Sequence, residues 1–316
     1  MYPWQKELKS RLCNELEKGK LPHALLFAGN KFLGKNDFAY SFAKTIMCKT
    51  KNDCGSCRTC IMLAAESNPD ILLVTAEKKI INVEQIREVN NFLQQKAVIA
   101  EAKVVIIEDA DKLNSAASNA LLKTLEEPKV TSYIILTCSN PEKLLPTIKS
   151  RVQKYLFKAP SKKQALDYMR IKASASEDKM ILSLSLSGNS PLGAIEKLEG
   201  NYFSERDIIL DDLFAYLNKE KNSIEIVEAW TKLDVKNILE ILQSIVVDII
   251  YIKEKAFDRV LNLDVKDKLS NIVNKNLDRT QNFLNVYQKL NLHSKELDTF
   301  ALNKELLLYS ILDDVF

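Results

Sequence analysis

The sequence predicts an α/β domain with a mostly parallel central sheet, followed by a region made only of helices. Strand-like and helix-like patterns alternate over residues 1–160, which is typical of a parallel sheet covered by helices. A glycine-bounded loop separates the first apolar run from a helical pattern. Strand signals end after residue 161, and seven glycines and eight prolines in 316 residues favour helices with short connections.

Four strands and a shorter fifth are expected in the first 160 residues. They are Ala24–Ala28, Ile71–Val74, Val104–Ile107, Tyr133–Thr137 and Tyr155–Phe157. Helical patterns lie between them at about 38–48, 83–96 and 115–127. Asn82 is placed to cap the second helix, with Gln85 three residues later. Its buried stripe would be Ile86, Val89 and Leu93, and Pro128 would end the third helix.

The remaining sequence divides into two helical parts. Residues 161–200 predict two or three short helices, broken at residues 188–191. Residues 204–316 predict four or five longer helices, with starts near Asp234, Asp264 and Asp278. Domain boundaries are therefore expected near 160 and 203. The apolar faces of the last part comprise Ile238, Ile241, Leu242, Ile245 and Ile249, then Phe283, Val286, Tyr287 and Leu290, then Leu302, Leu306, Tyr309 and Leu312. Such faces serve equally well as an intramolecular core or as an oligomer interface.

Four cysteines lie within thirteen residues, at Cys48, Cys54, Cys57 and Cys60. Four thiolates on one loop can form a tetrahedral shell around Zn²⁺, and Gly55 supplies the tight turn that such a knuckle needs. The spacing predicts a structural zinc module near 48–60. A full thiolate shell has no open position for water or substrate, which disfavours catalytic zinc, whereas iron could fill the same shell.

Two disulfides are the alternative use of these cysteines. Disulfides suit secreted chains, and here we expect no secretory leader, while Cys13 and Cys138 lie outside the cluster. A thiolate metal site in the reducing cytoplasm is the favoured interpretation. No stretch reaches eighteen apolar residues, so a membrane span is not expected.

The loop from Gly29 to Lys35 has the context of a phosphate-binding loop, between a strand and a helix. It matches G-x-x-x-x-G-K-[ST] until the last residue, where Asn36 replaces the hydroxyl that normally binds Mg²⁺. Phe32 and Leu33 are larger than the residues that usually let the backbone approach phosphate, and Asp37 adds a negative charge. The loop is therefore predicted to be a degenerate nucleotide site.

A second acidic motif follows the strand at 104–107. Glu108 and Asp109 stand where P-loop ATPases place a metal-binding carboxylate and a second carboxylate that activates water. Their order is reversed relative to the usual Asp-Glu, which would displace both carboxylates. Solvated acids at the end of a strand are the simpler alternative.

Three longer segments resemble the AAA+ clamp-loader family. Asn119–Pro128 reads NALLKTLEEP, Leu136–Arg151 resembles the sensor-1 and Ser-Arg-Cys region, and Leu21–Phe27 resembles the strand that leads into the P-loop. The resemblance is strong over residues 1–160. It implies a RecA-like AAA+ domain with an inserted zinc knuckle at 1–160, a small helical lid at 161–203 and a helical collar for oligomerisation at 204–316.

Differences from the family's ATP-hydrolysing γ/τ subunits indicate which kind of subunit this chain resembles. Those subunits keep Gly-Lys-Thr, an Asp-Glu pair and a lid arginine, whereas this chain has Asn36, the Glu108–Asp109 order and Leu192. The resemblance therefore implies an accessory stator of a DNA polymerase holoenzyme without intrinsic ATPase activity. Nucleotide binding stays open, and the degenerate site would comprise Gly29, Gly34, Lys35, Glu108 and Asp109.

Arg151 is retained in a Ser-Arg-Val context, although the family's third residue is usually Cys. The resemblance implies that Arg151 acts as an arginine finger in trans, at the ATP site of an adjacent γ/τ subunit. A surface arginine in a salt bridge is the alternative. The implied partners are γ/τ and δ subunits in a ring and, through the assembled complex, the sliding clamp and primer-template DNA during replication.

Two other functions compete with this interpretation. One is a self-sufficient AAA+ ATPase, which Asn36, Asp37 and Leu192 disfavour. The other is a nucleic-acid binder that uses Lys49, Lys51 and Arg58 around the knuckle. A net charge of +3 and three local cations are a small electrostatic footprint for that role.

Overall fold

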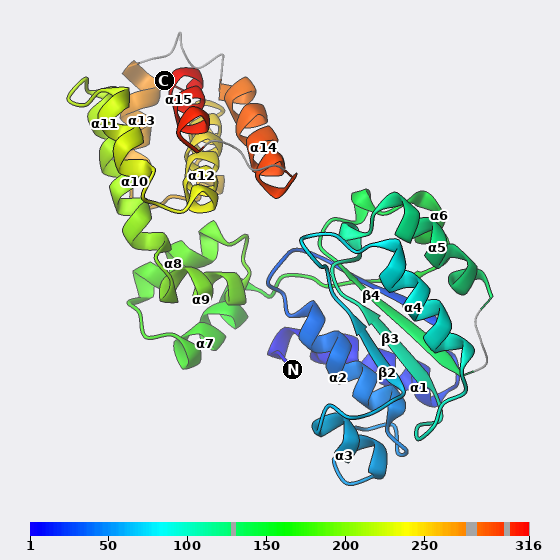
Figure 1. Ribbon diagram of the computed structural model, residues 1–316. Coiled ribbons are helices and arrows are strands. Elements are labelled where there is room, and N and C mark those ends of the chain that lie inside the picture. The colour runs from blue at the N-terminus through cyan, green and yellow to red at the C-terminus, as the bar shows by residue number, and fades with distance from the viewer. Residues whose placement is uncertain (128–130, 276–282, 300–303, 316) are drawn as a thin grey trace. The chain divides into compact units, whose positions relative to one another are not determined.

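The computed structural model describes residues 1–127, 131–275, 283–299 and 304–315, and it comprises two units, Met1–Gln164 and Ala165–Phe316 (Figure 1). The three-part division at 160 and 203 stays a prediction. Pro128, Asp278 and Leu302, which the sequence analysis singled out, lie outside the described residues.

The first unit contains a five-stranded sheet in the order β2-β3-β4-β1-β5, with every neighbouring pair parallel. The strands are β1 (Ala24–Ala28), β2 (Ile71–Val74), β3 (Lys103–Ile107), β4 (Ser132–Cys138) and β5 (Gln153–Leu156). The predicted parallel α/β fold is confirmed. The fifth strand starts two residues earlier than expected, because only Tyr155 on this edge strand is buried and the local apolar signal is weak.

Helices cover both faces of this sheet (Figure 1). In chain order they are η1 (Pro3–Gln5), α1 (Lys6–Glu17), α2 (Lys35–Met47), α3 (Arg58–Ala64), α4 (Val83–Gln94), η2 (Ala110–Lys112), α5 (Ser115–Glu126), η3 (Pro141–Lys143) and α6 (Pro146–Lys149). The Asn82–Gln85 capping box of α4 is present as predicted, and so is its buried stripe. Asn114 caps α5 by accepting from the Ala117 amide.

Alternation along the strands creates two apolar layers. Leu26 of β1 faces a core that α4 and α5 cover, whereas Leu25 and Phe27 face a second core that α1 and α2 cover. Strands buried on both faces read as continuous apolar runs, which is why the sequence revealed them. The carboxyl ends of β1, β3 and β4 meet at one edge, where the glycine loop and the acids are located.

In the second unit, the described residues contain helices and no strand. They are α7 (Lys162–Lys172, which begins at the boundary), α8 (Glu177–Leu186), α9 (Pro191–Glu199), α10 (Tyr202–Leu217), α11 (Ser223–Trp230), α12 (Val235–Lys253), η4 (Phe257–Arg259), α13 (Lys266–Lys275), α14 (Phe283–Thr299) and α15 (Lys304–Val315). A small core joins α7, α8 and α9, and a larger one joins α10 to α15.

The predicted apolar faces of this unit are largely confirmed. All five residues named on α12 are buried, and Asp234 caps that helix through the Lys236 amide. On α15 the prediction for Leu306 is wrong, since its side chain is 68% exposed and the buried face is Leu307, Leu308, Ile311 and Leu312. Helix α13 begins two residues after Asp264, and the Asp264 carboxylate accepts two hydrogen bonds of 2.8 Å from buried Arg206.

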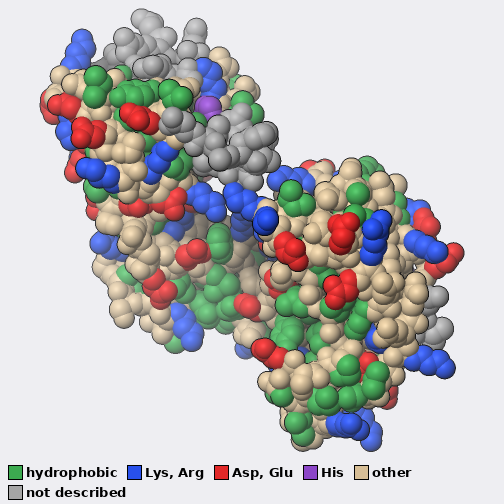
Figure 2. Space-filling model, viewed as in Figure 1, with side chains coloured by type: hydrophobic (Ala, Val, Ile, Leu, Met, Phe, Trp, Pro, Cys, Tyr) green, Lys and Arg blue, Asp and Glu red, His purple; other side chains and the backbone are tan. Residues whose placement is uncertain are grey.

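The surface carries charges of both signs. Lys, Arg, Asp and Glu side chains are interspersed over the visible face of the first unit, in keeping with the small net charge (Figure 2).

Among the described helices, none has the length and apolar character needed to cross a bilayer.

Candidate metal centre and nucleotide-binding loop

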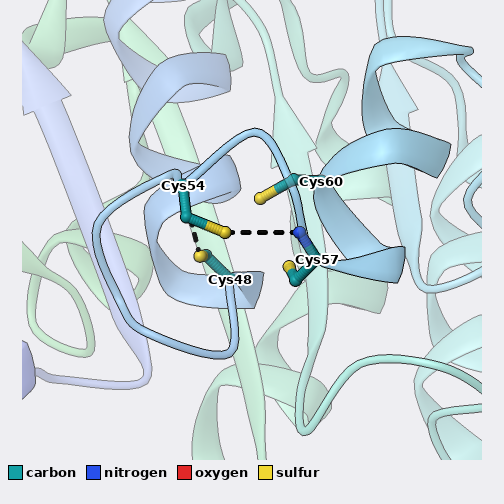
Figure 3. Close-up of side chains that lie close together, drawn as sticks. All are labelled: Cys48, Cys54, Cys57 and Cys60. Carbon is teal, nitrogen blue, oxygen red and sulfur yellow. Dashed lines mark hydrogen bonds between the residues drawn. The ribbon is translucent and has the colours of Figure 1, made fainter.

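The four clustered cysteines come from the end of one helix, a loop and the start of the next helix. Cys48 follows α2, Cys54 lies in the connecting loop, Cys57 immediately precedes α3, and Cys60 lies in its first turn. Their side chains point toward a common centre (Figure 3). The four sulfur atoms all lie within 4.8 Å of one another.

This geometry fits a metal ion. A tetrahedral shell with Zn–S bonds of about 2.3 Å has sulfur–sulfur edges of about 3.8 Å, so a small contraction would complete it. All six cysteines of the chain are free thiols in the structure, and the four clustered sulfurs form one group rather than two separate pairs. The cluster favours metal over the alternative of two disulfides.

Hydrogen bonds prepare part of the shell for thiolate. The amide of Cys54 donates to the Cys48 sulfur at 3.4 Å, and the amide of Cys57 donates to the Cys54 sulfur at 3.4 Å (Figure 3). Burial opposes ionisation of Cys48, but donors led by the Cys54 amide outweigh it and lower its pKa to about 5. The Ser56 hydroxyl and neighbouring amides lower the pKa of Cys54 to about 7. Burial raises the pKa of Cys60 to about 12.

The knuckle backbone is tightly wound. Lys51, Asp53 and Gly55 all have left-handed φ values, of 56°, 54° and 69°. Gly55 thus supplies the predicted turn, since this conformation costs glycine least. The Lys51 ammonium donates to the Ile46 carbonyl at 3.2 Å and pairs with Glu101 at 3.1 Å, which attaches the knuckle to the main domain. Lys51, which was considered above for nucleic-acid binding, thus has intramolecular partners.

The glycine loop lies between β1 and α2, as expected. A Cβ atom at Gly29 would overlap the carbonyl oxygen of Phe157, and one at Gly34, whose φ is +72°, would overlap the ring of Tyr2. Phe32 also adopts a left-handed φ of 58°, which is uncommon for an aromatic residue. The loop thus has left-handed backbone conformations at Phe32 and Gly34, although Phe32 has a large side chain.

The N-terminal turn packs directly on this loop, a contact that the sequence analysis missed. The Gln5 side-chain amide donates to the carbonyls of Leu33 and Gly34, each at 2.9 Å, and Gln5 is only 1% exposed. The Trp4 indole donates to the Leu33 carbonyl at 3.2 Å, and its ring stacks on Tyr2 with 5.0 Å between centroids. No local pattern reports this contact, because it joins segments 28 residues apart.

Lys35, the P-loop lysine, is engaged within the chain. Its ammonium donates to the Asn30 carbonyl at 2.7 Å and to the Ser139 hydroxyl at 3.1 Å, and the residue is 5% exposed. Burial lowers its pKa, while the carboxylates of Asp109 and Asp111 act in the opposite direction. Asp111 is a further acid of this site, and its carboxylate accepts from the Ser139 amide at 3.1 Å.

Glu108 and Asp109 follow β3 at the same edge. The amide of Asp109 donates to the Thr137 hydroxyl at 3.0 Å, and its carboxylate pairs with Lys112 at 2.9 Å. Burial raises the pKa of Glu108, and the nearby charges of Asp109 and Asp37 raise it further. The charge of Asp109 acts on Lys35, so the two motifs lie at the same edge of the sheet.

Arg151 lies just after α6, away from the cysteine cluster. Its guanidinium forms an ion pair with Glu126 and donates to the Thr147 carbonyl at 2.9 Å and to the Ser150 hydroxyl at 3.3 Å. The Arg151 side chain is 33% exposed. Leu192, expected at the position of the lid arginine, lies half-buried in the first turn of α9, within the second unit.

The parallel five-stranded sheet, its glycine loop and the acids at its carboxyl edge define a protein with an AAA+-like P-loop core. Two family models match the chain: "DNA polymerase III, delta subunit" over residues 4–161 and "DNA polymerase III, delta subunit, C terminal" over residues 201–315. The chain belongs to the DNA polymerase III delta′ family, clamp-loader proteins related to gamma/tau.

Individual relatives agree with this assignment. DNA polymerase III subunit delta′ of Pseudomonas aeruginosa is 34% identical, with 73% of this chain and 71% of that protein aligned. The delta′ subunit of Haemophilus influenzae is 30% identical over 73% and 72% of the two chains. The Haemophilus influenzae tau/gamma subunit is 33% identical, but the match spans 52% of this chain and 24% of that protein.

A solved structure supports the fold. A DNA polymerase III gamma subunit-related protein from Thermotoga maritima aligns over 96% of this chain and 97% of its own, with a TM-score of 0.50 and 18% identity.

Proposed function

We propose that this delta′-family chain is a non-hydrolysing stator of the clamp loader that supplies Arg151 in trans to the ATP site of an adjacent gamma/tau subunit. The observation that carries this proposal is a contrast within one domain. Lys35 of the chain's own nucleotide loop is 5% exposed and held by internal contacts, whereas the Arg151 side chain beside α6 is 33% exposed although it is paired with Glu126.

Several features support the absence of hydrolysis. Asn36 lacks the hydroxyl that binds Mg²⁺, and Lys35 donates to Asn30 and Ser139. Phosphoryl transfer depends on exact placement of a lysine, a metal and acids around the γ-phosphate, so these changes act on the same transition state. Whether the loop still binds nucleotide stays open in this proposal.

Arg151 suits the role of a finger on physical grounds. Its planar fork can donate two parallel hydrogen bonds to phosphate oxygens, and its charge is permanent. Arginine fingers in phosphoryl transfer contribute about 10³–10⁵ in rate at their own site. Because this Arg151 would serve one site among several in a ring, its loss should reduce the activity of the complex only partly.

We further propose that the cysteine module holds one structural Zn²⁺ and that residues 204–316 form the collar that joins the ring. The four converging sulfurs support the first proposal. The large helical core of α10 to α15 supports a stable module, and the family assignment favours its use in assembly. Gamma/tau and delta subunits would be the direct partners, and the clamp and primer-template DNA would be engaged through the assembled complex in the cytoplasm.

The test uses the loader reconstituted with its gamma/tau and delta subunits. We expect Arg151→Ala to leave folding, metal content and assembly unchanged while lowering DNA- and clamp-stimulated ATPase activity. Arg151→Lys should rescue poorly, because it restores the charge without the fork. Identical ATPase and clamp-loading curves for the three proteins would overturn the finger role. Robust ATP turnover by the isolated chain, abolished by Lys35→Ala, would instead establish a self-sufficient ATPase.

A further inference from the structure

Arg151, the proposed arginine finger, already forms an ion pair within its own subunit. Glu126, the last residue of α5, forms an ion pair with Arg151, and Thr147 and Ser150 accept from the same guanidinium. The ion pair therefore ties the end of α5 to the α6 turn, two elements that pack against each other. Both partners are partly exposed, at 49% for Glu126 and 33% for Arg151.

An arginine in this arrangement has competing partners. A guanidinium held by a carboxylate is partly neutralised. Here one terminal nitrogen is directed toward Glu126 of α5 and the other toward Thr147 and Ser150 at α6. Exposed ion pairs are weak, however, so a phosphate group can displace the carboxylate easily. A shift of α6 relative to α5 would also separate the two residues, because they belong to different elements.

We propose that Glu126 is a positioning residue that restrains Arg151 against α5 until the neighbouring nucleotide site closes, when phosphate takes the place of the carboxylate. This inference rests on the proposed finger role of Arg151. It assigns a regulatory contact to the same residue: Glu126 lowers ATPase activity in the unstimulated loader and has little effect once DNA and clamp have closed the site.

The experiment compares Glu126→Gln with wild type in the reconstituted loader. The glutamine keeps the size and a hydrogen-bond acceptor but removes the charge. We expect unstimulated ATPase activity to rise by about 1.4- to 5-fold, which converts the typical strength of an exposed pair through RT. The DNA- and clamp-stimulated kcat should stay unchanged. In an Arg151→Ala background, Glu126→Gln should have no effect.

Glu127→Gln is the matched control, because it removes the adjacent exposed carboxylate and should leave both activities unchanged. If Glu126→Gln changes nothing while Arg151→Ala lowers activity, the restraint is wrong and the finger role stands. A fall in stimulated kcat would overturn the inference in favour of a carboxylate that orients the active arginine. If Arg151→Ala has no effect, the proposed function itself is overturned.

Discussion

The hydroxyl of Tyr2 donates a hydrogen bond of 2.6 Å to the carboxylate of Asp37, across 35 residues of sequence. Asp37 lies in the first turn of α2, the helix whose N-terminus receives phosphate in an active P-loop. The N-terminal turn thus bonds to the loop through Trp4 and Gln5 and to the helix through Tyr2. The N-terminal turn is therefore part of the structure that holds the nucleotide loop in place.

The first prediction concerns Gln5. Gln5→Ala removes the donor to two loop carbonyls in a buried position, so we expect the free energy of unfolding to fall by about 1–3 kcal/mol. Chemical denaturation followed by circular dichroism measures this change. Gln94→Ala, on the exposed end of α4, is the control and should change it little. Equal stability of both variants would show that the Gln5 hydrogen bonds do not stabilise the folded chain.

The second prediction concerns the metal. The purified chain should contain one Zn²⁺, and Cys57→Ala should lose it, because three thiolates leave the shell incomplete. The sheet should stay folded, since the knuckle is inserted between α2 and α3. Elemental analysis gives the metal content, with Cys13→Ala as the control that should keep it. Metal-free, freshly purified and reduced wild-type protein would refute the site.

The third prediction is a pH dependence at Glu108. Burial raises the pKa of Glu108 in the folded chain above its ordinary value of 4.5. The folded state therefore holds this proton more tightly, and its relative stability is lost as pH rises through the folded pKa. We expect Glu108→Gln to be more stable than wild type at pH 7, with an advantage that shrinks as pH falls toward 4.5. Thermal unfolding across this range measures it.

Glu88→Gln, on the exposed side of α4, provides the baseline for that comparison. An advantage of Glu108→Gln that is constant with pH, or equal to that of Glu88→Gln, would contradict the burial argument.

The fourth prediction concerns assembly. A chain that ends near residue 203 should keep its zinc and its α/β fold, because both belong to the first unit, yet it should fail to enter the loader. Co-purification with tagged gamma/tau and delta subunits tests this. Metal content and circular dichroism of the truncated chain serve as controls for folding. Normal incorporation of the truncated chain would exclude the collar role of residues 204–316.

The sequence predicted β1, β3 and most of β4 because these strands are buried on both faces. Residues Ala24–Ala28 and Ile71–Val74 coincide with β1 and β2, since nearly unbroken apolar runs bounded by polar residues leave little freedom of placement. The phase of α15 was harder to predict. Its helix begins at Lys304 and turns Leu307 and Leu308 inward, so Leu306 of the predicted stripe is exposed, whereas Leu312 of the same stripe is buried.

Some parts of the candidate sites could also be predicted from the sequence, and others could not. The cysteine cluster was predictable because all four ligands lie within one short loop, where spacing alone limits their geometry. The partners of Arg151 and Leu33 were not, because Glu126 and Gln5 lie 25 and 28 residues away and no periodic signal links them. Contacts of that kind become visible only when the chain is folded.

The N-terminal turn also bears on how this family member could change over evolutionary time. On the proposed function, restoring a hydroxyl at residue 36 would supply only one missing element of hydrolysis. The loop would still be bonded to Gln5 and Trp4, and Asp37 would still be bonded to Tyr2. Substitutions of Tyr2, Trp4 or Gln5 that free the loop would each remove one of these hydrogen bonds. Such substitutions would cost stability before any activity returned. On the proposed function, this favours keeping the role of a partner subunit over regaining independent ATP hydrolysis.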